Sequence, residues 1–233
     1  MPKLNVIPLT KPVSNGIIII AIDGPAGAGK STVAKILAQK LGISYLDTGA
    51  MYRALTLKAL RNKVNLEDGA QLGHLAEKTK IELRPVGDGL NVFLDGQDVS
   101  EDIRTLEVTN NTFYIARAPE VRTIMVKWQQ EFGQKQSLVA EGRDIGTVVF
   151  PNATKKFYLD ADPDERAQRR IKELREKGKE VDEQALQKEI QERDEKDFTR
   201  KVGPLKKADD AIVIDSSGMT AEQSADILLK YIK

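Results

Sequence analysis

The segment Gly24–Ser31 constrains the fold of this chain more than any other. It runs Gly-Pro-Ala-Gly-Ala-Gly-Lys-Ser and matches the pattern G-x-x-x-x-G-K-[ST] in full. The continuous apolar run Ile17–Ile22 precedes it and is typical of a strand buried on both faces of a parallel sheet. After the loop, apolar residues recur at helical spacing at Val33, Ile36, Leu37 and Leu41, and Gly42 follows as a helix end. A strand, a glycine-rich loop and a helix in this order predict an α/β fold.

The residue types in this loop suit a bound triphosphate. Its glycines allow backbone amides to turn inward around a phosphate, and the helix N-terminus adds partial positive charge. Lys30 can bridge the β- and γ-phosphates, and the Ser31 hydroxyl is placed to ligate Mg²⁺. We therefore predict ATP as a ligand, with Mg²⁺ as cofactor, held by Gly24, Pro25, Ala26, Gly27, Ala28, Gly29, Lys30, Ser31 and Thr32.

Alternating patterns along the rest of the chain predict a five-stranded parallel sheet flanked by helices. Further strands are expected at Ile43–Leu46, Leu138–Ala140, Phe157–Leu159 and Ile212–Ile214, separated by helical stretches. Between Ile81 and Val99 the apolar period changes to two, with turns at Gly87-Asp88-Gly89 and Asp95-Gly96, which predicts a small antiparallel insertion. The segment 163–201 is helical by propensity and more than half charged, and a break near Gly178 and 179–182 predicts two helices.

These patterns suggest one domain after a short tail. We expect a flexible tail at 1–16 and a single domain over 17–233, for which a hydrophobic content of 40% is sufficient. Its core would comprise about 17–62, 103–162 and 203–233, with the insertion at about 63–102 and the helical hairpin at about 163–202.

Composition and charge exclude several classes of function. A net charge of +1 argues against a nucleic-acid binder, and the lack of cysteine excludes disulfides, thiolate zinc sites and cysteine nucleophiles. The longest apolar run, Ile17–Ile22, is far shorter than the ~20 residues of a membrane helix, and the first sixteen residues do not resemble a secretory signal. We expect a cytoplasmic protein without nucleic-acid or membrane partners.

Two arginines follow predicted strands and suggest how the triphosphate is used. Arg53 ends the segment after the second strand, and Arg143 follows Leu138–Glu141. Ligands of open α/β sheets bind at the carboxyl ends of the strands, and an arginine fork there suits a phosphate. Because Leu138–Glu141 continues into Gly-Arg-Asp, it differs from the acidic strand of motor ATPases, and no Asn-Lys-x-Asp motif of switch GTPases is present. The pattern favours phosphate transfer to an anionic acceptor.

Four motifs carry a resemblance to a known family. They are Ile22–Thr32, Leu46–Arg53, Glu141–Pro151 and Glu192–Arg200. In order and spacing they resemble those of bacterial cytidylate kinases, and the similarity covers nearly the whole chain from about Ile17. The resemblance implies a P-loop kinase fold, ATP and CMP or dCMP as substrates, an antiparallel insertion in the acceptor-binding region, a helical lid, and a monomer.

The resemblance also implies roles for individual residues. Arg53 and Arg143 would hold the acceptor phosphate, Arg122 and Asp144 would meet the cytosine edge, and Asp197 would bind the ribose. The full acceptor set is Thr48, Tyr52, Arg53, Arg122, Arg143, Asp144, Asp197 and Arg200. The catalytic set is Lys30, Arg143, Arg193 and Arg200, and the lid arginines Arg166, Arg169 and Arg170 would reach the triphosphate.

The chain departs from the family pattern at two positions. Phe113 stands where the family usually has a serine near the base, with Thr112 as a substitute hydroxyl, and Lys196 replaces an arginine common in the lid. The first departure leaves open whether the acceptor is CMP, UMP or either pyrimidine nucleotide. A nucleotide-gated binding protein and a P-loop ATPase subunit are the alternatives from other classes.

Three further residues invite attention. His74, the only histidine, lies away from every motif, and we expect it on the surface; Trp128 is expected to be partly buried packing. Asp23 could contact the Mg²⁺ shell through water or order the adjoining loop, and we favour the second role.

Overall fold

The computed structural model describes residues 16–86, 89–176, 178 and 180–232. The expected tail, apart from residue 16, lies outside the described residues, as do the predicted turn at Gly87-Asp88 and residue 179 of the predicted break.

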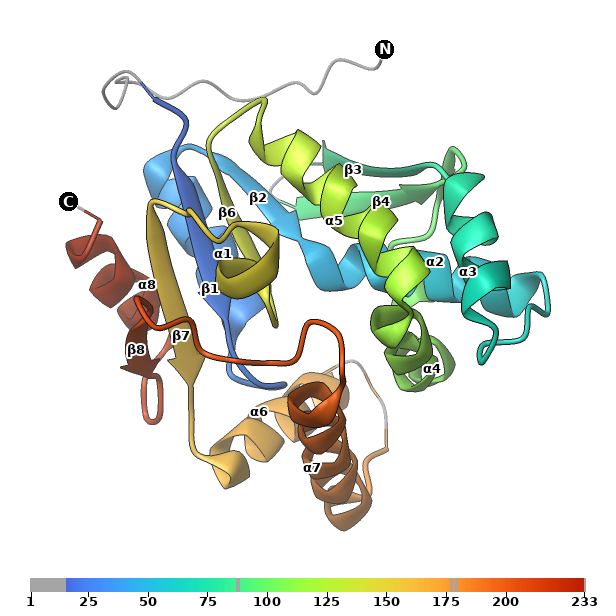
Figure 1. Cartoon of the computed structure of the whole chain (residues 1–233). Coiled ribbons are helices and arrows are strands. Elements are labelled where there is room, and N and C mark those ends of the chain that lie inside the picture. Colours follow the sequence, from blue (N-terminus) through green and yellow to red (C-terminus); the bar gives the residue numbers. More distant parts are fainter. Residues whose placement is uncertain (1–15, 87–88, 177, 179, 233) are drawn as a thin grey trace.

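A five-stranded parallel sheet forms the centre of the molecule (Figure 1). Its strands lie in the order β2-β6-β1-β7-β8. All neighbours pair in parallel, as in the register Ile20↔Val139 between β1 and β6. The strands are β1 (Ile19–Asp23), β2 (Ser44–Asp47), β6 (Leu138–Gly142), β7 (Lys155–Asp160) and β8 (Ile212–Asp215). The predicted α/β fold is confirmed.

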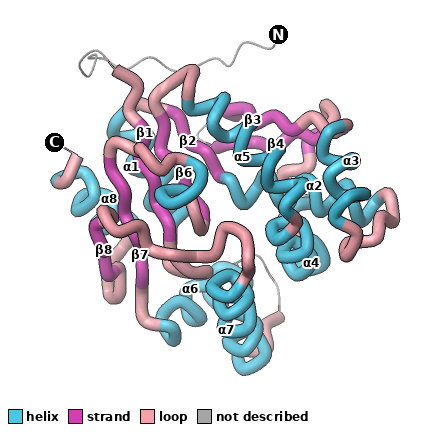
Figure 2. Tube along the Cα trace, viewed as in Figure 1, coloured by secondary structure: helices cyan, strands magenta, loops and turns pink. Residues whose placement is uncertain are grey.

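Helices cover both faces of this sheet (Figure 2). On one face, α1 (Lys30–Leu41) and α8 (Ala221–Lys230) enclose a core that includes Ile20 and Ile22 of β1. On the other, α2 (Thr48–Arg61), α4 (Leu106–Arg117) and α5 (Pro119–Gly133) share a larger core with Ala21, and α3 (Gly69–Glu77) packs on α5. Because successive residues of β1 enter different cores, the whole run had to be apolar.

The antiparallel insertion is a three-stranded sheet. It consists of β3 (Ile81–Val86), β4 (Gly89–Leu94) and β5 (Gln97–Asp98), in that spatial order. Its inward residues Leu83, Val92 and Leu94 belong to the same buried cluster as Met51 of α2. The insertion is therefore continuous with the main core.

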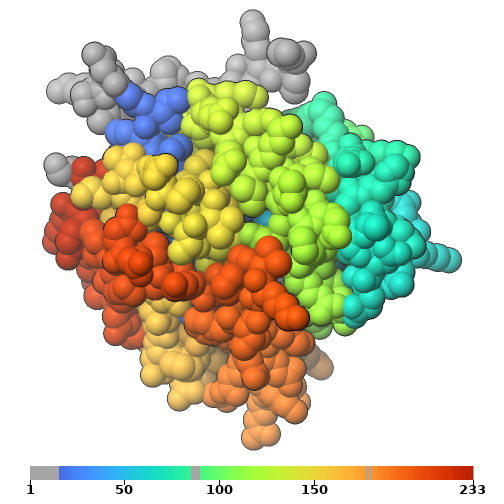
Figure 3. Space-filling view, viewed as in Figure 1, coloured from blue at the N-terminus to red at the C-terminus, as the bar shows by residue number. Residues whose placement is uncertain are grey.

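Two charged helices between β7 and β8 form a hairpin. The helices are α6 (Pro163–Glu176) and α7 (Glu183–Thr199), with Asp182 capping α7 through a bond from the Ala185 amide. The pair encloses a small apolar cluster of its own, formed by Ala167, Ile171, Leu174, Leu186 and Ile190. In the space-filling view, this hairpin lies against the surface of α4 and α5 (Figure 3). Within the described chain, no helix has the length and apolar character needed to cross a membrane.

Candidate active site

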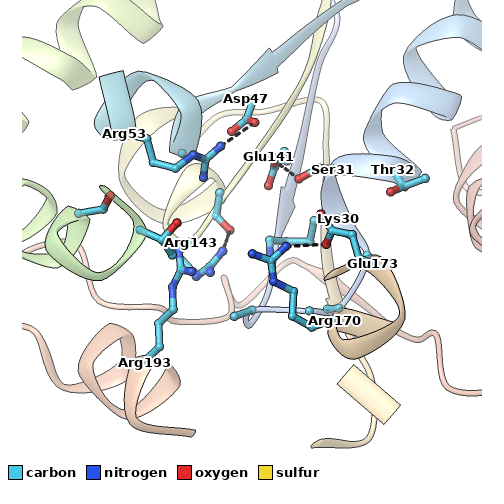
Figure 4. A pocket seen from close by; sticks show the side chains of 18 of the residues that line it. Lys30, Ser31, Thr32, Asp47, Arg53, Glu141, Arg143, Arg170, Glu173 and Arg193 are labelled. Atoms are coloured by element: carbon cyan, nitrogen blue, oxygen red, sulfur yellow. Dashed lines mark hydrogen bonds and ion pairs between the residues drawn. The ribbon is translucent and has the colours of Figure 1, made fainter. Parts of the chain in front are cut away.

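A polar cleft of about 980 Å³ lies at the carboxyl ends of β1, β2 and β6. The phosphate loop, the start of α2, one face of α4 and both helices of the hairpin form its walls (Figure 4). Most predicted site residues line it: Ala26 to Thr32, Thr48, Tyr52, Arg53, Arg143, Asp144, Arg169, Arg170, Arg193, Asp197 and Arg200. Gly24, Pro25 and Arg122 are not among the lining residues.

Lys30 is the first residue of α1 and lies deep in the cleft. Its ammonium donates a hydrogen bond to the Pro25 carbonyl at 2.6 Å, and only 5% of the residue is exposed. Burial, with the nearby charge of Arg143, lowers the pKa of Lys30 to about 7. The cation is thus poorly compensated by protein groups, and an anionic ligand would restore its charge.

Ser31 and Glu141 meet beside the loop. The Ser31 hydroxyl donates to Glu141 Oε1 at 2.6 Å, and the Tyr45 hydroxyl donates to the same oxygen at 3.3 Å. Burial, and then the charge of Asp47, raise the pKa of Glu141. Hydroxyl and carboxylate oxygens are ligands that Mg²⁺ accepts, and a cation here would also stabilise the buried carboxylate. This pair therefore fits a cation carried in with a triphosphate.

Glu141 was absent from the predicted site. The sequence contained a signal for it, since an acidic residue ends the apolar run Leu138–Ala140. The continuation of that run into Gly-Arg-Asp distinguishes it from the acidic strand of motor ATPases, so the strand pattern alone does not identify Glu141 as a site residue. The structure places the acid at the cleft end of β6, opposite the phosphate loop.

Several arginines converge opposite the phosphate loop (Figure 4). Arg53 donates to Asp47 at 3.1 Å, and Arg143 donates through Nε to Asp197 at 2.7 Å. Burial, followed by the charge of Arg143, lowers the pKa of Arg193 to about 10. Although burial opposes its ionisation, Arg143 and Arg193 hold the pKa of Asp197 below its usual range. Guanidinium groups crowded in this way could hold a phosphate group.

A buried ion pair lies at the end of the cleft beside α5. Arg122 pairs with Asp144, Arg200 approaches the other Asp144 oxygen at 3.5 Å, and Arg122 also donates to the Tyr52 hydroxyl at 3.4 Å. Burial raises the pKa of Asp144. Only Asp144 of the pair lines the cleft, so Arg122 lies behind it and holds it in place. The Thr48 hydroxyl donates to the Glu141 carbonyl at 2.8 Å, which joins α2 to β6.

The hairpin arginines separate into two groups. Arg169 and Arg170 line the cleft, where Arg169 donates to the Ser216 carbonyl at 2.6 Å and Arg170 donates to Glu173 at 2.6 Å. Arg166 is not among the lining residues; it pairs with Asp194 and donates to the Ala26 carbonyl of the phosphate loop at 2.9 Å.

The two departures from the family pattern contact each other. Thr112 lines the cleft, whereas Phe113 is not among the lining residues and points toward the hairpin. The Lys196 ammonium lies 5.9 Å from the centre of the Phe113 ring, and the Arg117 guanidinium lies 5.1 Å from it. Phe113 therefore joins α4 to the hairpin through the cation–π contact with Lys196, whereas the Arg117 contact lies within α4.

The remaining singled-out residues are structural. His74 is exposed and Trp128 packs partly buried on the main core, as predicted. Asp23 orders a loop, as favoured, but the loop is the one after β6. Its carboxylate accepts the amides of Ile145 and Gly146 at 2.7 and 2.8 Å, at the start of a single π-helical turn over Ile145–Val149.

A family model and curated relatives both point to one family. The cytidylate kinase family model matches residues 20–233. A cytidylate kinase of Desulforamulus reducens is 52% identical over 214 residues, covering 92% of this chain and 96% of the relative. A cytidylate kinase of Bacillus subtilis is 49% identical, with the same coverage. A solved structure of an uncharacterized protein from Eubacterium ventriosum aligns with a TM-score of 0.53 at 17% identity, covering 93% of this chain and 98% of that one, a likeness of fold alone.

Proposed function

This chain belongs to the cytidylate kinase family, and we propose that it transfers the γ-phosphate of ATP to CMP or dCMP, giving ADP and CDP or dCDP. One observation carries the proposal: the cleft has two separate anion-binding regions that face each other. The phosphate loop with Lys30 forms one, and Arg53, Arg143 and Arg193 form the other. Two phosphate-bearing ligands brought together in one cleft are what phosphoryl transfer requires.

The geometry suits direct in-line transfer. An oxygen of the acceptor phosphate attacks the γ-phosphorus, and the bond from that phosphorus to the β,γ-bridging oxygen breaks. ADP leaves with the electron pair. The acceptor oxygen is already ionised at neutral pH, so no general base is needed. Lys30, Arg143 and Arg193 stabilise charge on the transferred group by their positions.

We propose that Mg²⁺ enters with ATP and is held on the protein side by Ser31, with Glu141 beside it. When bound, the ion supplies charge neutralisation between the phosphates. Among the described residues, no group of three or more His, Asp or Glu side chains forms a separate metal site, which agrees with a cation bound mainly through the nucleotide.

The acceptor base would lie beside Asp144. Cytosine offers an N4 amino donor and N3 and O2 acceptors, and the carboxylate of Asp144 accepts from an amino group. Uracil has a carbonyl at position 4, which would face that carboxylate unfavourably. The insertion at about 63–102 would support this side of the cleft, and the hairpin at about 163–202, called the lid from here on, would close over both nucleotides.

We also propose a cytoplasmic monomer with no nucleic-acid or membrane partner. Every group placed at the cleft comes from one chain, and a cysteine-free sequence suits a reducing compartment. Sedimentation of the purified protein with and without nucleotides tests the monomer.

The decisive experiment measures ADP release with CMP, dCMP, UMP, AMP and GMP as acceptors. We expect the highest kcat/KM with CMP or dCMP. Asp144→Asn places an amide where the carboxylate stood and should narrow the difference between CMP and UMP. Equal rates with AMP would contradict the acceptor assignment, and no transfer to any monophosphate would contradict kinase function.

A further inference from the structure

Both backbone polar groups of Ala26 in the phosphate loop are bound by the lid. The N–H donates to Asp194 Oδ1 at 3.0 Å, and the C=O accepts from Arg166 Nη1 at 2.9 Å. Arg166 and Asp194 also pair with each other, and each is only 7% exposed. Arg166 comes from α6 and Asp194 from α7, so both lid helices contact the backbone of the same loop residue.

Neither charged side chain serves as a cleft wall. Arg166 and Asp194 are not among the lining residues. They bond to Ala26 and to each other, and Arg166 Nε also donates to the Ala161 carbonyl just after β7. The backbone of α6 also approaches the loop closely, because a Cβ built on Gly27 (φ +77°) would lie 2.9 Å from the Arg166 carbonyl oxygen. The loop and the lid therefore fit together along an extended contact.

The same α7 helix reaches the acceptor side of the cleft. Asp197, one turn after Arg193, accepts from Arg143, and Arg200 at the end of α7 approaches Asp144 at 3.5 Å. Arg193, Asp197 and Arg200 line the cleft, while Asp194 faces the phosphate loop. A single helix thus touches the acceptor region with some side chains and the ATP loop with another.

We propose that Arg166 and Asp194 are positioning residues that couple the two nucleotide sites, so that an acceptor bound against α7 strengthens ATP binding at the phosphate loop. The coupling rests on the proposed function, since it requires a monophosphate at Arg193 and Asp197. When the acceptor fixes α7, Asp194 and Arg166 fix the backbone of Ala26, and the following loop amides are held ready for the phosphates. By linkage, ATP strengthens acceptor binding by the same factor.

The contacts with Ala26 explain why the pair is buried and charged. The backbone N–H of Ala26 needs an acceptor and its C=O needs a donor, and a carboxylate paired with a guanidinium provides both from two different helices. If the lid moves away, Ala26 loses both partners together. The loop conformation therefore depends on the lid, which suits an enzyme that should bind ATP productively only beside its acceptor.

The test measures the affinity for a non-hydrolysable ATP analogue with and without saturating CMP. In the unaltered protein we expect CMP to tighten binding about tenfold, within the range of ordinary allosteric couplings. In Asp194→Asn, the ratio of the analogue affinities with and without CMP should fall to about one. The affinity for CMP measured alone should change by less than about twofold. The fall in kcat should be larger than any change in the KM for CMP. The matched control is Glu195→Gln, which removes an exposed acid at the next position of α7 and should keep the full factor.

A second variant guards against misfolding. Arg166→Met combined with Asp194→Leu replaces the buried pair by apolar side chains without leaving an unpaired charge, and such exchanges are often neutral for stability. It should also lose the coupling while retaining its thermal midpoint. Arg166→Lys alone keeps the charge and should retain part of the coupling that the double variant loses.

The results separate this proposal from the proposed function. Phosphate transfer to CMP by the unaltered protein, measured in the same preparation, tests the function alone. If transfer occurs but Asp194→Asn keeps the full factor, or if CMP never changes ATP affinity, the coupling is overturned and the kinase assignment stands. If no monophosphate binds or reacts, the function itself fails.

Discussion

ATP binding at pH 8 is expected to take up close to one proton from the solvent, because Lys30 is largely neutral in the empty cleft. Burial and the charge of Arg143 lower the pKa of Lys30 from 10.5 to about 7. At pH 8 only about one protein in ten then carries this ammonium. A bound triphosphate places negative charge around the amine and favours its protonated form.

The size of the effect follows from the same pKa. The gap of about 3.5 between the ordinary and the perturbed value corresponds to about 5 kcal/mol between the two protonation states, which the phosphates must offset. Uptake should be about 0.9 proton at pH 8 and about 0.1 at pH 6. Affinity for ATP should therefore fall nearly tenfold for each pH unit above 8.

Calorimetry in buffers of different ionisation enthalpy measures the uptake directly. Phosphate groups ionise near pH 6 and contribute little at pH 8. Lys30→Arg is the matched control, since a guanidinium keeps its charge above pH 12 and should show almost no uptake. An uptake at pH 8 that equals that of Lys30→Arg would refute the argument.

Three further predictions concern single substitutions. In Gly203→Ala, the alanine would have to adopt the left-handed φ of +56°, and its Cβ would lie about 2.3–2.5 Å from atoms of Arg122 and Asp144. Because this buried ion pair lies beside the proposed base site, kcat/KM for CMP should fall at least about tenfold while ATP affinity changes little. Unchanged CMP kinetics would contradict the pocket geometry. Burial raises the pKa of Asp23 from 3.8 to about 6, so its stabilising contribution is complete below about pH 4 and is lost as the pH rises through 6. Between these pH values, the free energy of unfolding in urea should therefore change by about 3 kcal/mol less in Asp23→Asn than in the unaltered protein. The same change in both proteins would exclude this role. Arg143→Ala should lower kcat by about 10²–10³ with ATP still bound, and near-normal kcat/KM for CMP would remove this residue from the mechanism.

Local patterns predicted the fold well. The phosphate loop, the apolar strands and the change of period in the insertion each occupy a few consecutive residues, and each carries its own geometric requirement. The break between α6 and α7 was found in the same way. Even so, β6 extends two residues beyond the predicted strand, because its cleft end carries Glu141 and Gly142 rather than apolar side chains.

Contacts between distant residues could not be predicted in this way. Ser31 and Glu141 are 110 positions apart, and only the parallel pairing of β1 with β6 brings them together. In a helix rich in charge, the sequence does not indicate which charge faces the loop. Arg166 was therefore grouped with the triphosphate arginines, although it pairs with Asp194, and Asp194 was assigned no role.

The separate apolar cluster of α6 and α7 has a consequence for how the molecule comes apart. The insertion shares the main core, so displacing it would expose apolar surface of α2. The lid carries its own cluster, and the polar contacts identified between it and the phosphate loop are hydrogen bonds to which water offers substitutes. Amide hydrogens of α6 and α7 should therefore exchange in a sub-global opening, well before those of the sheet. Bound nucleotides should slow the exchange of the lid amides until their protection approaches that of the sheet amides.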